Sequence, residues 1–220
     1  MKKMKTFLII VVVFALITLV TWMYAGYAYF WGPFGSLHNM KVRKMIGNSE
    51  EYSSKNVVRS DNNILENKNV LFLGSSVTYG AASLQEAMPE YFAKRLGCIV
   101  TKEAVSGTTL VDTGLDSYVS RLKRNVDTST DYKLVICQLS TNDATQKKPL
   151  GVLEDSFDID SFDTSTITGA MEYIIAYCKQ NWNCPVMFYT GSRYDSEAYS
   201  LMVERLYEIS EKWGIGVLDL

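Results

Sequence analysis

The sequence predicts an α/β protein with a five-stranded parallel sheet, preceded by one membrane-spanning helix. From residue 69 onward, short apolar segments alternate with amphipathic segments, the pattern of parallel strands joined by right-handed crossover helices. The segment Lys133–Leu139 is nearly all apolar, as a central strand buried on both faces should be. The segment Phe7–Phe30 has no charged residue and exceeds the roughly 20 residues that a helix needs to cross a bilayer.

The amino-terminal apolar segment has lysines before it and a cluster of Trp and Tyr residues at its far end. Lysines favour the cytoplasmic side, and aromatic residues favour the membrane interface. We therefore expect residues 1–31 to be a cytoplasmic tip and single-pass anchor, with the remaining chain extracytoplasmic at the cell membrane. The alternative is a cleaved signal peptide with a site at Gly26-Tyr27-Ala28. The apolar segment is longer than a usual signal-peptide core of about 7–15 residues, which favours the anchor.

Residues 32–68 are polar and weakly patterned, which predicts a stalk or linker. The net charge of −2 with interspersed signs gives no reason to expect a nucleic-acid partner. The chain has four cysteines and one histidine, with no CxxC motif, so no metal site is predicted. Cys178 and Cys184 flank a short helix-to-strand connection where pairing is feasible outside the membrane. Cys137 lies inside an apolar segment and is expected to be a buried thiol.

The alternation begins with a strand at Asn69–Leu73, which ends at Gly74. Each amphipathic segment has apolar residues at helical spacing, and Pro89 and Gly97 mark the start and end of the first helix. The remaining expected strands are Cys98–Ala104, Lys133–Leu139, Pro185–Thr190 and Ile215–Leu220. The expected helices are Pro89–Leu96, Ser117–Val126, Thr166–Asn181 and Ser196–Trp213. The acidic segment Ala144–Thr164 between them is expected to lie over the carboxyl edge of the sheet.

Small and polar residues follow the first three strands where each strand ends. The sequences there are GSSVTYG from Gly74, EAVSGTTL from Glu103, and LSTND up to Asp143. Carboxyl ends of parallel strands meet at one edge of a sheet, where ligands bind in open α/β folds. A serine at a strand-to-turn corner, beside N–H and amide donors, has the arrangement that acyl transfer requires.

In order and separation these three segments resemble the first three sequence blocks of the SGNH (GDSL-like) hydrolases. The resemblance covers residues 69–220 and implies a three-layer flavodoxin-like fold with strand order 2-1-3-4-5. It implies an esterase that needs no cofactor, with Ser76 as catalytic nucleophile. The implied oxyanion hole consists of Ser76, Gly107 and Asn142.

The fourth block of that family, an Asp-x-x-His that supplies the catalytic base, has no counterpart in the sequence. His38 lies before the first strand, and Asp219 is not followed by a histidine. The family pattern also has an aspartate at Ser75, an asparagine near Lys102 and a glycine at Ser140. These departures indicate a divergent member whose carboxyl-terminal part is missing or which is a pseudoenzyme.

Together these features predict a membrane-anchored extracytoplasmic serine ester hydrolase, impaired in this chain by the missing histidine. The expected substrate is a small acyl ester or an O-acylated glycan or lipid. Two alternatives remain open. One is a non-catalytic, membrane-tethered binding module. The other is a flavodoxin-like domain in which Ser75, Ser76, Thr78 and Gly80 cradle a phosphate or flavin.

Overall fold

The computed structural model describes residues 2–61, 63–192 and 194–220. It contains two compact units, Met1–Ser53 and Ser54–Leu220. The first unit consists of the long helix α1 (Lys2–Tyr29) followed by short helical turns. These turns are η1 (Gly35–Leu37), α2 (His38–Val42), η2 (Ile46–Asn48) and η3 (Glu50–Tyr52).

Helix α1 is apolar along nearly its whole length, and its apolar side chains are exposed. The segment Lys3–Tyr29 has a mean hydropathy of 2.7 and is long enough to cross a membrane. An amino-terminal signal sequence can meet the same criteria of length and hydropathy. The chain folds back just after the helix, where Trp31 packs on Trp22 with ring centroids 5.3 Å apart. A side chain at Gly26 would collide with the Phe34 carbonyl, so this close return requires glycine.

The second unit is built on a five-stranded, all-parallel sheet in the order β2-β1-β3-β4-β5. This is the order that the family resemblance implies. The strands are β1 (Asn69–Gly74), β2 (Ile99–Ala104), β3 (Tyr132–Gln138), β4 (Val186–Tyr189) and β5 (Gly216–Leu218). The longer helices are α4 (Met88–Leu96), α5 (Tyr118–Asn125), α7 (Ile167–Trp182) and α8 (Glu197–Trp213).

Three shorter helices follow strand ends or lie in loops, and the sequence pattern does not indicate them. They are α3 (Ser76–Tyr79), α6 (Thr141–Thr145) and η5 (Ile159–Ser161).

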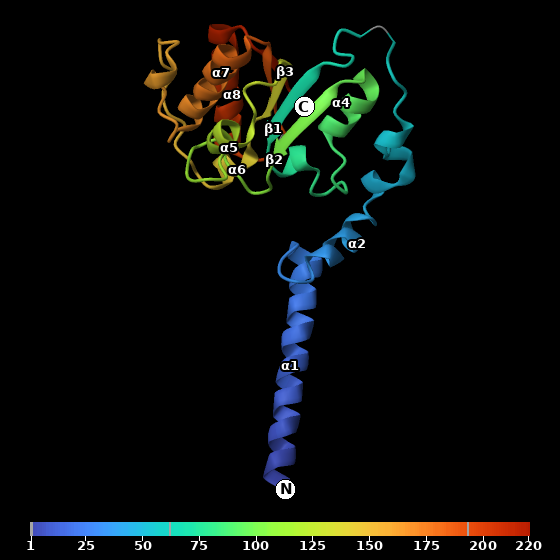
Figure 1. Ribbon diagram of the computed structural model, residues 1–220. Coiled ribbons are helices and arrows are strands. Elements are labelled where there is room, and N and C mark those ends of the chain that lie inside the picture. The colour runs from blue at the N-terminus through green and yellow to red at the C-terminus, as the bar shows by residue number, and fades with distance from the viewer. Residues whose placement is uncertain (1, 62, 193) are drawn as a thin grey trace. The chain divides into compact units, whose positions relative to one another are not determined.

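Helices cover both faces of the sheet, as Figure 1 shows with α4 on one side and α5, α7 and α8 on the other. The larger apolar core lies under α5, α7 and α8 and includes Leu71, Val135 and Phe188. The smaller core lies under α4, where Phe72 packs edge-on against Phe92. The three-layer α/β prediction is therefore confirmed.

Residues 54–68 are hydrogen bonded to the sheet-containing unit. This part of the chain begins with η4 (Ser54–Asn56), and the Ser54 N–H donates to Glu86. The Ser60 N–H donates to the Arg95 carbonyl, and the Asn67 N–H to the Gly97 carbonyl. By contacts, the second unit thus begins before residue 69. The predicted division into an anchor, a linker and a domain from residue 69 stays a prediction.

The acidic segment packs mainly on the helices. Phe162 is buried in the larger core, and Lys212 of α8 donates to the carbonyls of Glu154 and Ser156. Most of the segment is therefore held against α7 and α8 rather than over the edge of the sheet. Cys178 and Cys184 are buried free thiols, so the feasible disulfide between them is not formed.

Candidate active site

The turn after β1 places Ser76 at the start of the short helix α3. Gly74 allows this turn, because a Cβ there would lie 1.7 Å from the Thr78 hydroxyl. Ser75 is fully buried, whereas Ser76 is partly exposed. Within the described residues the Ser76 hydroxyl has no hydrogen-bond partner. Of the two adjacent serines, only Ser76 is thus accessible from the solvent.

Gln138, the last residue of β3, holds this turn from beneath. Its buried Oε1 accepts the N–H groups of Ser75 at 3.0 Å and Thr78 at 3.2 Å. It also accepts the Thr78 hydroxyl at 2.8 Å, and that hydroxyl lies 2.6 Å from the Tyr189 hydroxyl. Ser75 before Ser76 and Thr78 after it are therefore both hydrogen bonded to β3.

The loop after β2 carries Gly107, which has a φ of +82°. Other residues are strained in this left-handed conformation, although nothing lies within 4 Å of the place where a Cβ would be. Glycine is thus required here for backbone conformation rather than for space. Within the described residues, the Gly107 N–H has no acceptor, so it is free to donate to a ligand.

Asn142 lies in α6 and its side chain reaches the Gly107 loop. Its amide Nδ2 donates to the Thr108 carbonyl at 2.8 Å. The same carbonyl accepts the Ser140 hydroxyl at 3.2 Å. One of the two Nδ2 hydrogens of Asn142 is used in this bond, and the other has no acceptor within the described chain. Asn142 is therefore positioned by the loop and keeps one donor available.

Asp143 joins the same two loops below the surface. Its carboxylate accepts the N–H groups of Leu110 at 2.9 Å and Val111 at 3.1 Å. Burial raises the pKa of Asp143 above its ordinary value of 3.8, and the two N–H groups oppose that shift. The carboxylate is thus a structural acceptor that fixes the loop after β2 to α6.

Arg121 of α5 ties the first two loops together from inside the protein. Its side chain is 1% exposed and pairs with Glu103 at 2.9 Å. The guanidinium also donates to the Gly74 carbonyl at 2.8 Å and to the Thr108 hydroxyl at 3.2 Å. One buried cation therefore holds the end of β1, the end of β2 and the Gly107 loop in a fixed relation.

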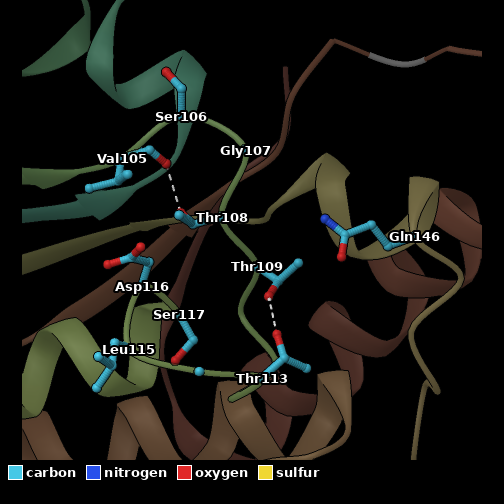
Figure 2. Close-up of a pocket in the computed structure, with 11 residues that line it drawn as sticks. Val105, Ser106, Gly107, Thr108, Thr109, Thr113, Leu115, Asp116, Ser117 and Gln146 are labelled. Atoms are coloured by element: carbon cyan, nitrogen blue, oxygen red, sulfur yellow. Dashed lines mark hydrogen bonds between the residues drawn. The ribbon is translucent and has the colours of Figure 1, made fainter.

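A pocket of about 470 Å³ lies against the Gly107 loop. Figure 2 shows that loop along one side and Gln146 pointing across from the end of α6. Ser76 and Asn142 do not line it. Its lining residues are Val105, Ser106, Gly107, Thr108, Thr109, Thr113, Gly114, Leu115, Asp116, Ser117 and Gln146.

The sheet-containing unit, residues 54–220, has no histidine that could serve as the base. His38 belongs to the amino-terminal unit, where its Nδ1 lies 3.1 Å from the Tyr27 carbonyl. Asp219 accepts the Thr190 hydroxyl at 2.9 Å and the Tyr207 hydroxyl at 3.3 Å. In the part of the chain that the structure describes, no group of three or more His, Cys, Asp or Glu residues is arranged to hold a metal.

Three residues that organise this site are not indicated by the sequence motifs. Gln138 is a polar residue in an otherwise apolar strand, and that contrast is a usable signal for an internal hydrogen-bond acceptor. Arg121 and Asp143 have no such signal, because a charged residue in a helix is usually on a solvated face. Their burial depends on which loop packs over them, and local sequence does not reveal this.

No family model matches the chain, and no curated protein matches it either. Several solved structures share its fold. A putative GDSL-like lipase from Bacteroides ovatus is 19% identical, with a TM-score of 0.55 over 70% of this chain and 84% of the other. A putative GDSL-like lipase from Bacteroides uniformis is 21% identical, with a TM-score of 0.52 over 68% and 81%. A family two carbohydrate esterase from Clostridium thermocellum is 14% identical, with a TM-score of 0.52 over 69% and 53%.

Proposed function

We propose that this protein is a serine ester hydrolase of the SGNH type, in which Ser76 is the nucleophile. The observation that carries the proposal is the convergence of three loops on one edge of the sheet. They bring a reachable serine hydroxyl, the Gly107 N–H and the Asn142 amide to the carboxyl ends of β1, β2 and β3. The fold shared with GDSL-like lipases supports the same reading.

In the proposed reaction, the Ser76 hydroxyl oxygen attacks the ester carbonyl carbon. The Gly107 N–H, the free hydrogen of Asn142 and the Ser76 N–H donate to the carbonyl oxygen as it becomes an oxyanion. The bond to the alcohol oxygen then breaks, and the acyl group remains on Ser76. The proton of Ser76 passes through a base to the departing alcohol. Water then cleaves the acyl-serine and releases the acid.

The proposed reaction needs a base to accept the Ser76 proton, and residues 54–220 contain no histidine. The only histidine, His38, is held within the amino-terminal unit. We therefore expect low turnover from residues 1–220 alone. Triad enzymes that lack one member keep about 10³–10⁴-fold catalysis over water, from the oxyanion hole and substrate binding.

The phosphate-binding alternative is less well supported at this turn. The Ser75 and Thr78 N–H groups both donate to Gln138, and the side chains of these two residues are fully buried. The Gly80 N–H donates to the Ser76 carbonyl within the turn. Few donors remain free to cradle a phosphate.

We further propose that α1 anchors the domain at the outer face of the cell membrane. The support is the length and apolar character of α1 together with the lysines that precede it. An extracytoplasmic location would give the enzyme access to acylated glycans and lipids of the cell envelope.

A serine-reactive fluorophosphonate tests the nucleophile assignment. Labelling of the full chain at mildly alkaline pH, followed by peptide mass spectrometry, should locate the adduct on Ser76. Ser76→Ala should lose labelling and ester turnover, whereas Ser75→Ala should keep both, because Ser75 interacts with Gln138 mainly through its backbone N–H. Asn142→Ala should lower turnover about 10²–10³-fold.

Free imidazole provides a second test of the nucleophile assignment, because it can act as an external base. It should accelerate turnover by the wild-type chain and by Ser75→Ala, but not by Ser76→Ala. Labelling that is unchanged in Ser76→Ala would refute the nucleophile assignment. The absence of any adduct, with or without imidazole, would favour the non-catalytic binding module.

A further inference from the structure

The pocket beside Gly107 has the size of a binding site for a small molecule. Its volume of about 470 Å³ falls within the roughly 300–1,000 Å³ of such sites. Gly107 belongs both to this pocket and to the proposed oxyanion hole. A ligand in the pocket would therefore lie next to the place where the ester carbonyl is bound.

The walls of the pocket are fixed before any ligand binds. The Thr108 hydroxyl donates to the Val105 carbonyl at 2.7 Å, as Figure 2 shows, and the Thr109 hydroxyl donates to the Val111 carbonyl at 2.9 Å. The Ser117 hydroxyl donates to Asp112. A ligand that enters such a pocket does not have to order these loops, which lowers the entropic cost of binding.

Three other polar groups of the pocket have no internal partner. Within the described residues, the Ser106 hydroxyl, the Gly107 N–H and the side-chain amide of Gln146 make no hydrogen bond. The side chain of Asp116 is 74% exposed, and its nearest cation is Arg124 at 3.9 Å. The pocket thus offers a hydroxyl, a backbone donor, an amide and a carboxylate, a set that both donates and accepts hydrogen bonds.

This set of groups disfavours two classes of ligand. An anion would meet the Asp116 carboxylate, which already pairs with Arg124 at 3.9 Å. The other nearby cation, Arg121, is 1% exposed and already bonded to protein acceptors. An acyl chain would find little apolar surface, because Val105 and Leu115 are the only large apolar residues in the lining. A neutral polyhydroxylated ligand matches the groups that remain.

We propose that the pocket binds a neutral sugar unit, which forms the alcohol part of an O-acylated glycan substrate. This inference rests on the proposed ester hydrolase function and names its substrate class. The sugar hydroxyls donate to Asp116 and exchange hydrogen bonds with Ser106 and Gln146. The acyl group extends past Gly107 toward Ser76.

Binding can be measured without turnover by saturation-transfer NMR on the full chain, in a detergent without a sugar head group. The probes are the methyl glycosides of glucose, xylose, mannose and N-acetylglucosamine. At least one should receive saturation from the wild-type chain. Gln146→Ala and Asp116→Asn should each weaken binding about tenfold, the value of one good hydrogen bond. The matched controls are Gln180→Ala and Asp155→Asn, exposed residues outside the pocket.

The outcomes distinguish a failure of the sugar site from a failure of the proposed ester hydrolase function. Saturation transfer that falls in the pocket variants and persists in the controls supports the sugar site, whether or not Ser76 reacts with the phosphonate. Labelling of Ser76 without saturation of any glycoside overturns the sugar site and leaves the hydrolase standing. Equal losses in pocket and control variants also overturn it. Ser106→Trp, which fills the pocket, should abolish binding with an unchanged circular dichroism spectrum.

Discussion

Gln138 provides the sharpest test of how the turn that contains Ser76 is held. Gln138→Leu removes the acceptor of the Ser75 and Thr78 N–H groups, which are buried. Each buried donor left unpaired costs about 1–3 kcal/mol. The Thr78 hydroxyl keeps Tyr189 as a partner. Gln138→Leu also removes the buried Nε2 group, which has no hydrogen-bond partner, and this offsets part of the destabilisation. We expect a net loss of about 1–3 kcal/mol in unfolding free energy.

The assay is urea unfolding of the full chain in detergent micelles, followed by circular dichroism, alongside the rate of phosphonate labelling at Ser76. The variant should label much more slowly than wild type even where it is fully folded, because a displacement of about 1 Å at a reacting group can cost 10²-fold. Gln180→Leu, on the exposed face of α7, is the matched control. A Gln138→Leu chain as stable and as reactive as this control would refute the reasoning.

Three further predictions concern the anchor, a buried acid and a buried ion pair. Amino-terminal sequencing of the mature protein should find α1 retained, and a new terminus near Tyr29 would instead indicate signal cleavage. Burial raises the pKa of Asp143 above 3.8, so the native state binds the proton more tightly than the unfolded state does. The free energy of unfolding should therefore fall as the pH rises from 3.8 to the raised pKa. Asp143→Asn should reduce this pH dependence in acid titrations followed by fluorescence. Lys212→Met leaves the fully buried Glu172 without its cation and should cost about 3–5 kcal/mol in denaturant unfolding, whereas Lys147→Met, at an exposed position, should cost little.

The sequence carries enough local information to predict the regular elements of the sheet-containing unit. All five expected strands and the four expected helices lie within two residues of the observed bounds. Periodicity and end signals give this agreement because they are properties of short segments. Helices α3 and α6 were missed because four and five residues are too few to show a helical period. Strand order is not a local property, and it came from the family resemblance alone.

The internal support of the site was not predictable in the same way. Ser76, Gly107 and Asn142 stand in recognisable motifs, and their catalytic roles stay predictions. The residues that hold the loops in place, such as Arg121, act across long sequence separations, on Gly74 and Thr108 in this case. A charged residue in a helix gives no sign that it will be buried between two loops. Only the packed structure reveals which carbonyls it meets.

The same network includes two residues that differ from the sequence pattern that the chain resembles. Ser75, where the family has an aspartate, is buried and gives its N–H to Gln138. Ser140, where the family has a glycine, donates to the Thr108 carbonyl and accepts the Asn142 N–H at 3.2 Å. Both substitutions therefore place a small side chain where it adds or permits a hydrogen bond between the loops. These bonds hold the turns around Ser76 without the aspartate and the glycine of that pattern. The proton acceptor is different, since no hydrogen bond between loops can take its place.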